Sequence, residues 1–143
     1  MIGILIITHG ALGESLVECA THVLGKVPGQ LASLAVNSQD DPNSLIPKAM
    51  DLVAQVNSGD GVLVLSDMYG ATPCNIVAKI LQPGLVEGVA GVNLPMLVRA
   101  MTYRHEPLSM LVEKAVSGGR EGVVAFNREN CERYEQAPLN DRF

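Results

Sequence analysis

The feature that most constrains the fold of this chain is an apolar run without alternation. Residues 2–7 are Ile and Leu, interrupted only by Gly3, which is the pattern of a strand buried on both faces. Helical spacing follows at once, with an apolar face that begins at Leu12 and continues through Leu16 and Ala20 to Val23. A strand buried on both faces needs helices above and below it, so this start predicts an α/β fold.

The same alternation continues along the chain. Further strands are predicted at residues 31–36, 62–66, 86–92 and 123–126. Helices are predicted from Asn43 or Ser44, from Thr72, from Pro95 and from Pro107, the last one closing at residues 118–119. Pro47 fits the helix that starts at Asn43 or Ser44 only if it lies in the first turn of that helix. The expected architecture is a three-layer sandwich, with helices on both faces of a mostly parallel sheet.

Composition supports one domain and limits the classes of partner. The 143 residues are 48% hydrophobic but only 3% aromatic, which predicts an aliphatic core. We assign residues 1–126 to the domain and residues 127–143 to a polar C-terminal tail. The net charge of −5 and the lack of a basic run disfavour nucleic acid. No apolar stretch reaches the about 18 residues of a membrane span, and the N-terminus lacks a signal-peptide pattern, so we expect a cytoplasmic protein.

The three cysteines are dispersed, which predicts free thiols rather than a disulfide framework. Cys19 falls on the predicted apolar face of the first helix and is expected in the core. Cys74 follows a helix start, where a low-pKa thiol is one interpretation and buried packing the favoured one.

Two polar residues follow predicted strands at the edge where ligands bind in α/β folds. His9 follows the first strand and Asp67 follows the third, so parallel strands would bring them to the same edge. A carboxylate that accepts a hydrogen bond from Nδ1–H would fix the tautomer of His9 and leave the Nε2 lone pair free to attack. The structural alternative for each residue is a cap at a strand end.

A turn downstream of Asp67 adds a site for an anion. Gly70 and Ala71 lead into a helix with Thr72 as the predicted N-cap and Pro73 as its first residue. Main-chain N–H groups at such a terminus suit a phosphate. On this segment alone an ordinary N-cap is the favoured interpretation. The chain has no Walker A or G-x-G-x-x-G sequence, so nucleotide binding has no support.

Four separated blocks then identify a resemblance that covers residues 1–126: ILIITHGALGESL, GVLVLSDMYGATPCN, GVNLPML and GREGVVAF. They resemble the enzyme IIA domain of the mannose-type (mannose/fructose/sorbose) sugar phosphotransferase system. The resemblance implies a phosphotransferase that carries a phosphoryl group on Nε2 of His9, with Asp67 orienting the ring. It implies that the Thr72 hydroxyl, with Ala71 and Gly70, binds the phosphoryl oxygens, and that no metal or cofactor is required.

The resemblance also implies partners. The phosphoryl donor would be the histidine-containing phosphocarrier protein and the acceptor an enzyme IIB, with a membrane permease involved only indirectly; a soluble regulatory role is the other option. A homodimer is implied in which the last strand, antiparallel and within residues 118–126, is exchanged between subunits. One departure is Ala71, which stands where the family commonly has glycine and could alter the pocket.

Other functions remain open at this stage. The chain could be the phosphoryl-donor subunit of a dihydroxyacetone kinase, or a binding and regulatory module whose His9 is never modified. A hydrolase that uses His9 and Asp67 as acid and base ranks last, because the chain has no G-x-S-x-G elbow or metal cluster. His22 lies near the apolar face of its helix without a motif, and His105 and Arg99 are expected at the surface. Sugar specificity is not encoded in this chain.

Overall fold

The computed structural model describes residues 1–136 of the chain, and residues 137–143 lie outside the described part. Four parallel strands form one sheet in the order β2-β1-β3-β4. The strands are β1 (Gly3–His9), β2 (Leu31–Val36), β3 (Val62–Ser66) and β4 (Val86–Ala90). The helices are α1 (Leu12–Leu24), α2 (Pro42–Val56), α3 (Thr72–Ile80), α4 (Leu94–Thr102), α5 (Leu108–Glu121) and α6 (Arg128–Gln136).

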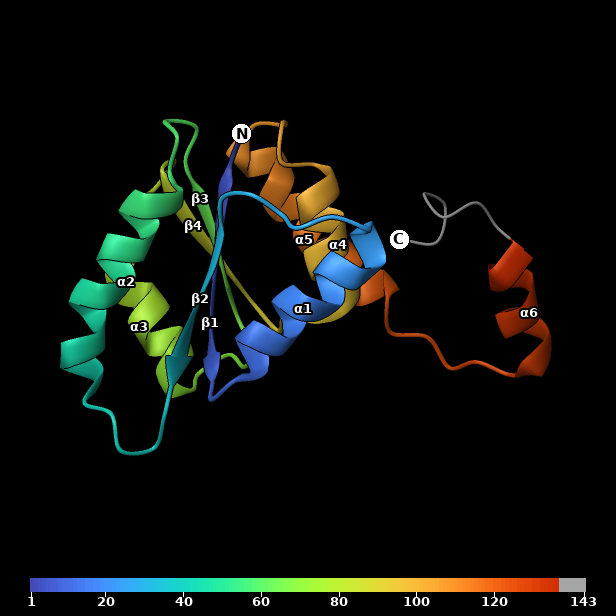
Figure 1. Ribbon diagram of the computed structural model, residues 1–143, viewed down its shortest axis with the longest axis horizontal. Coiled ribbons are helices and arrows are strands. Elements are labelled where there is room, and N and C mark those ends of the chain that lie inside the picture. Colours follow the sequence, from blue (N-terminus) through green and yellow to red (C-terminus); the bar gives the residue numbers. More distant parts are fainter. Residues whose placement is uncertain (137–143) are drawn as a thin grey trace.

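Helices cover both faces of the sheet, as the sequence predicted. Helices α2 and α3 pack on one face, and α1, α4 and α5 pack on the other (Figure 1). Strand β1 contributes side chains to the core on each face of the sheet. Ile4 and Ile6 pack under α1, α4 and α5, and Leu5 and Ile7 pack under α2 and α3. Strands such as this one read as continuous apolar runs because each face is buried.

Gly3, which interrupts the first apolar run, is explained by a close approach of the main chain. A Cβ atom at this position would lie 2.3 Å from the carbonyl oxygen of Val56, at the end of α2. Only glycine leaves room for that contact, so the interruption belongs to the strand rather than ending it.

The order of the strands reverses direction between β1 and β3. The chain passes from β1 to β2 on one side and then crosses to β3 on the other side of β1. His9 ends β1, and Asp67 directly follows β3, so the two residues lie on either side of the point of reversal. Open α/β sheets bind ligands at this point, outside the carboxyl ends of the strands.

Helix α2 starts earlier than the sequence predicted. Asp41 is its N-cap and accepts a hydrogen bond from the main-chain N–H of Asn43, with Pro42 as the first helical residue. Pro47 therefore lies in the second turn, and its predicted place in the first turn is wrong. The exposed proline leaves the helix unbroken, although one main-chain hydrogen bond is lost.

Helix α5 continues through the two glycines that were predicted to close it. A Cβ atom at Gly118 would lie 2.9 Å from Cβ of Arg99, and one at Gly119 would lie 2.7 Å from Cε of Met96. The glycines therefore let α4 and α5 pack closely, and the helix ends at Glu121. Arg99, expected at the surface, has a side chain only 18% exposed and pairs with Glu121 at 2.6 Å.

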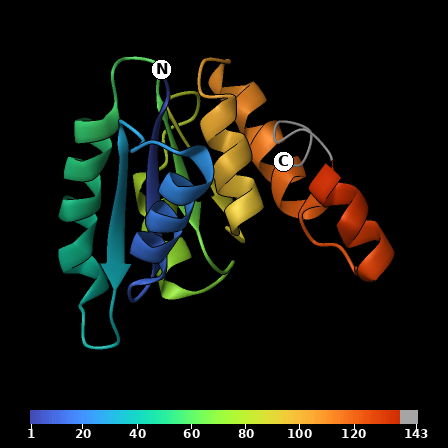
Figure 2. The same cartoon turned by 45° about the vertical axis from the view of Figure 1, so that its right-hand side comes forward.

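The predicted strand at residues 123–126 is absent from the single chain. Residues 123–127 have no regular structure, and Val123 and Phe126 are 77% and 76% exposed. No strand in the described residues pairs with this segment. The segment leads to α6, which stands apart from the sandwich (Figures 1 and 2) and forms part of the predicted polar tail. Exchange of this segment with a second copy stays a prediction.

Two smaller expectations about the surface are also corrected. Cys19 is exposed, because the inward face of α1 is a narrow stripe formed by Gly13, Leu16 and Ala20. Cys74 is half-buried rather than buried, whereas His22 and His105 are exposed. In residues 1–136, no helix is long and apolar enough to cross a membrane.

Candidate functional site

The structure brings His9 and Asp67 into direct contact. Nδ1 of His9 lies 2.8 Å from Oδ2 of Asp67, and the main-chain N–H of His9 donates to the same oxygen at 3.0 Å. The imidazole is 54% exposed, whereas the Asp67 side chain is only 11% exposed. The nucleophile candidate therefore lies at the surface and its carboxylate partner beneath it.

This pairing determines what the imidazole can do. A carboxylate that faces Nδ1 places the ring proton on Nδ1, so Nε2 keeps its lone pair. Because the two nitrogens lie on different sides of the ring, Nε2 faces away from Asp67 and toward solvent. The arrangement suits nucleophilic attack by Nε2 on an electrophile that approaches from outside.

The environment of Asp67 keeps its carboxylate ionised. Burial is the largest single influence and by itself raises the pKa, but the two hydrogen bonds from His9 and the charge of its ring outweigh it. The pKa of Asp67 is therefore lowered from the ordinary 3.8. The other carboxylate oxygen, Oδ1, is buried and has no hydrogen-bond partner among the described residues.

Thr8 and Gly10 hold the turn that carries the imidazole. The Thr8 hydroxyl accepts a hydrogen bond of 2.8 Å from the main-chain N–H of Gly13, which anchors the first turn of α1 to the end of β1. Gly10 has φ of +51°, and its N–H donates to the carbonyl of Val36 at 2.9 Å. The turn is thus tied to both α1 and β2.

The start of α3 is open to an anion. Thr72 is the first helical residue and Ala71 is the N-cap, so the prediction of Thr72 as the N-cap is wrong. No side chain caps this terminus, and its first turn holds no acidic residue. The Thr72 hydroxyl is consequently free of a capping role, beside N–H groups at the positive end of the helix. Gly70, with φ of +82°, makes the turn that leads there.

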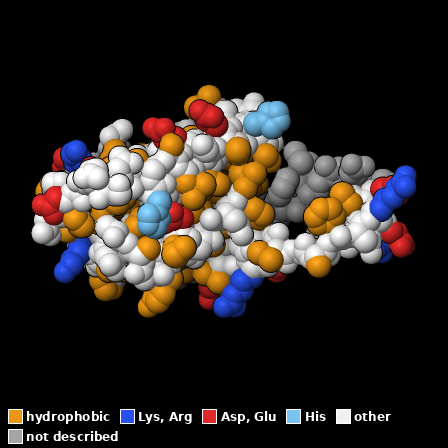
Figure 3. Space-filling view, turned by 90° about the horizontal axis from the view of Figure 1, so that it is seen from below, with side chains coloured by type: hydrophobic (Ala, Val, Ile, Leu, Met, Phe, Trp, Pro, Cys, Tyr) orange, Lys and Arg blue, Asp and Glu red, His pale blue; other side chains and the backbone are white. Residues whose placement is uncertain are grey.

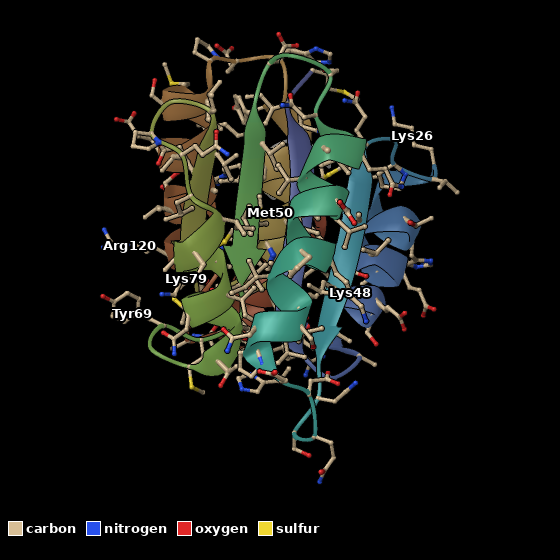
Figure 4. The ribbon with its side chains drawn as sticks, turned by 90° about the vertical axis from the view of Figure 1, so that its left-hand side faces the viewer. Lys26, Lys48, Met50, Tyr69, Lys79 and Arg120 are labelled. Carbon is tan, nitrogen blue, oxygen red and sulfur yellow. The ribbon has the colours of Figure 1, made fainter. Side chains whose placement is uncertain are left out.

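A cleft of about 460 Å³ joins the imidazole to the start of α3. Its lining residues are His9, Gly10, Val36, Asn37, Ser38, Asp40, Pro42 and Thr72. Figure 3 views this end of the molecule and shows a histidine beside an acidic side chain, with hydrophobic side chains around them. Tyr69, from the loop after β3, is 86% exposed and points away from the body (Figure 4), so it does not line the cleft.

The turn between β2 and α2 is the part of the site that the sequence analysis missed. Asn37, Ser38 and Asp40 were given no functional role from the sequence, yet they line the cleft beside His9. Their place follows from the parallel register, in which His9 pairs with Val36. His22, His105 and Cys74 do not line this cleft, and the described residues contain no group of three metal-ligating side chains.

Comparison with known proteins gives a consistent result. Residues 3–116 match the family model EIIA-man, described as "PTS system fructose IIA component". The chain is 35% identical to the "PTS system mannose-specific EIIAB component" of Escherichia coli (strain K12) over an alignment of 149 residues. The same values hold for the Shigella flexneri protein of that name. These alignments cover 96% of this chain but 43% of each relative, so the chain spans less than half of their length.

Two solved structures share the fold. Component EIIA from Streptococcus agalactiae has a TM-score of 0.78 and 24% identity, covering 88% of this chain and 98% of that one. The mannose/sorbose specific IIA subunit from Enterococcus faecalis has a TM-score of 0.79 and 21% identity, covering 88% and 95%. At these identities the comparison establishes the architecture, and the chemistry is argued from the site.

Proposed function

The chain belongs to the EIIA-man family of phosphotransferase-system IIA components, and on that premise we propose that it carries a phosphoryl group on Nε2 of His9. The observation that carries the proposal is the 2.8 Å contact between Nδ1 of His9 and Oδ2 of Asp67, beside the open start of α3. Membership of the family places the chain in the sugar phosphotransferase system. The phosphorylation of the histidine and the roles of the residues around it are proposed from the geometry of the site.

Transfer is a displacement at phosphorus. The bond between phosphorus and the donor nitrogen breaks as a bond forms from phosphorus to Nε2 of His9, and the electron pair returns to the donor nitrogen. Nδ1 keeps its proton, so the phosphorylated ring gains positive charge. The ionised Asp67, in contact with Nδ1, balances this charge and holds the ring in the attacking orientation. Transfer onward reverses these steps.

The start of α3 holds the phosphoryl oxygens. The Thr72 hydroxyl and the main-chain N–H groups at Ala71 and Thr72 are the donors in this scheme. Gly70 supplies the left-handed turn, with φ of +82°, that leads into this helix start, and Thr72 lines the same cleft as His9. Ala71 has φ of −91°, which any residue adopts, so its methyl group causes no strain there.

Two protein partners follow from this role. The histidine-containing phosphocarrier protein would supply the phosphoryl group, and an enzyme IIB would receive it. The Escherichia coli relative is named an EIIAB component, and this chain matches 43% of it. The relatives named above are all phosphotransferase-system components, so a role beside a dihydroxyacetone kinase is not favoured.

The direct test is phosphorylation with phosphoenolpyruvate, enzyme I and the phosphocarrier protein. The expected result is a mass gain of one phosphoryl group that is labile to acid and stable to base. His9→Ala removes the label, whereas His22→Ala, which changes another exposed histidine, retains it. Labelling that persists in His9→Ala would place the site elsewhere, and an unlabelled wild type would indicate an unmodified regulatory module.

We also propose that residues 123–126 pair with a second copy of the chain as an exchanged antiparallel strand. Val123 and Phe126 are exposed, and no strand in the described residues pairs with the outer edge of β4 beyond the bridge between Gln82 and Val86. Figure 4 shows β4 as the outer strand, on the side where Lys79 and Arg120 lie.

Measuring the mass in solution tests this exchange. Val124→Lys should convert a dimer into a monomer, because a charged side chain replaces an apolar one in the segment that would form the interface. Val27→Lys, at a position 83% exposed, is the control and should leave the dimer intact. A monomeric wild type would contradict the exchange without affecting the role of His9.

A further inference from the structure

The cleft beside His9 is larger than a phosphoryl group requires. Its volume of about 460 Å³ corresponds to roughly fifteen water molecules at about 30 Å³ each. Thr72 and the start of α3 account for one part of the lining. The remaining wall is the turn between β2 and α2, which carries Asn37, Ser38 and Asp40.

This wall is held by hydrogen bonds within the turn and to the end of β1. Asp40 closes the turn, because its Oδ2 accepts from the N–H of Asn37 at 2.8 Å and its own N–H donates to the carbonyl of Asn37 at 3.0 Å. The bond from Gly10 to Val36 ties the turn to the residue that follows His9. The position of the wall relative to the imidazole is therefore preorganised.

Two side chains on the wall have no role within the chain. The amide of Asn37 and the hydroxyl of Ser38 are exposed and make no hydrogen bond among the described residues. The carboxylate of Asp40 is engaged in the turn, and that of Asp41 caps α2. Asn37 and Ser38 thus offer neutral hydrogen-bonding groups to whatever enters the cleft, and the carboxylate of Asp40 lies in the same wall.

The strand order places this wall across β1 from Asp67. Asp67 follows β3 on one side of β1, and the turn follows β2 on the other side. Nδ1 of His9 contacts Asp67, and the exposed ring lines the same cleft as Asn37 and Ser38. In phosphoryl transfer the leaving atom lies in line with the attacking atom, beyond phosphorus. The donor must therefore enter this cleft to reach His9, and the turn forms one of the cleft's walls.

We propose that Asn37 and Ser38 are specificity-determining residues that hydrogen-bond the polypeptide segment of the partner that bears the phosphoryl group. The phosphoryl oxygens themselves stay with Thr72 and the start of α3. This inference rests on the proposed function, because it requires a protein donor at His9. It adds a recognition surface that is distinct from the groups that hold phosphate.

The test compares Asn37→Ala/Ser38→Ala with wild type in two measurements. The first is kcat/KM for phosphorylation by the phosphorylated carrier protein, which should fall about 10- to 100-fold if two partner hydrogen bonds are lost. The second is the half-life of the isolated phosphoprotein, which should change less than twofold. Gln39→Ala, an exposed residue of the same turn, is the matched control and should leave both values unchanged.

Each remaining outcome overturns the inference in a distinguishable way. An unchanged kcat/KM would mean that the wall does not contact the partner. A half-life altered in proportion to kcat/KM would mean that the two side chains hold the phosphoryl group. A wild-type chain that takes no label would remove the proposed function and this inference together, whereas a labelled wild type with an unaffected double variant removes only the inference. Equal melting temperatures establish that the variant is folded.

Discussion

Oδ2 of Asp67 accepts two hydrogen bonds from one residue, the ring Nδ1 of His9 at 2.8 Å and its main-chain N–H at 3.0 Å. A single carboxylate oxygen therefore fixes both the imidazole and the backbone at the end of β1. The charge of Asp67 and its geometry can be separated by substitution, because an amide oxygen accepts hydrogen bonds without carrying charge.

Asp67→Asn should slow phosphoryl transfer to His9 about 10- to 100-fold, by analogy with the loss of a carboxylate that orients a metal-ligating histidine. The amide keeps a hydrogen bond to the ring but does not balance the positive charge that the ring gains on phosphorylation. Rapid-quench measurement of label on the protein checks this rate. A variant with an unchanged melting temperature and wild-type transfer would contradict the assigned role.

Acid should destabilise the fold through Asp67. Its pKa is lower in the folded chain than the ordinary 3.8, so the unfolded chain binds the proton more readily. The carboxylate therefore contributes stability above pH about 3.8 that is lost as the pH falls through the folded pKa. Urea unfolding of wild type and Asp67→Asn between pH 6 and pH 2.5, taken as approximate limits, should give curves that converge at the acid end.

The control for this pH dependence repeats the urea measurement after His9→Ala is introduced into both the wild type and Asp67→Asn. Removal of the ring deletes one hydrogen bond and the nearby charge, while the main-chain N–H of residue 9 remains. The acid-dependent difference should become smaller but not vanish. An undiminished difference would show that another group holds Asp67 in its ionised form.

Thr72→Val should separate catalysis from stability. The hydroxyl does not cap α3, so its loss should change the free energy of unfolding by less than about 0.5 kcal/mol. Phosphoryl transfer should slow about 10- to 100-fold, because a hydrogen bond to a charged group contributes roughly 1.5–3 kcal/mol. Thr72→Ser restores the hydroxyl and should restore the rate. Equal rates for the Val and Ser variants would remove this residue from the site.

Gly70→Ala and Ala71→Gly should both lower stability, but for different reasons. Gly70→Ala places a Cβ at φ of +82°, where nothing lies within 4 Å, so the cost is conformational and about 1–2 kcal/mol. Ala71→Gly adds freedom to the unfolded chain at an ordinary φ and should cost about 0.4–1 kcal/mol. Calorimetry of both variants checks the two values, and a neutral Gly70→Ala would show that the turn adjusts.

The order of strands and helices was predictable because strands buried on both faces leave few arrangements. The candidate site followed from the same pattern, since His9 is the last residue of β1 and Asp67 comes directly after β3. The end of α5 was not predictable, because a glycine pair fits both a helix stop and a close helix contact. At Gly118 the close contact is with Arg99, which lies in another helix and could not be identified from the local sequence.

The wall of the cleft shows a second limit of sequence reasoning. Asn37 and Ser38 carry no motif, and only the pairing of His9 with Val36 brings them to the imidazole. The role of Thr72 depended on a helix boundary that moved by one residue, from N-cap to first helical residue. Pairwise register and exact boundaries are set by packing between distant segments, which local patterns describe poorly.

A buried arginine gives the last prediction, at the end of the sheet opposite the site. Arg104 is 3% exposed, and its guanidinium donates to the carbonyls of Ile2, Gly29 and Gln30 at 2.9, 2.6 and 2.6 Å. It therefore joins the starts of β1 and β2, and burial lowers the pKa of its guanidinium. Arg104→Met should cost about 3 kcal/mol or more, because several buried carbonyls lose their donors at about 1–3 kcal/mol each. Arg104→Lys should recover only part of this, since an ammonium lacks the planar fork that reaches three acceptors. Urea unfolding measures both losses, and the folded fraction should still accept label on His9 at the wild-type rate; a slower rate would show that this end of the sheet influences the site.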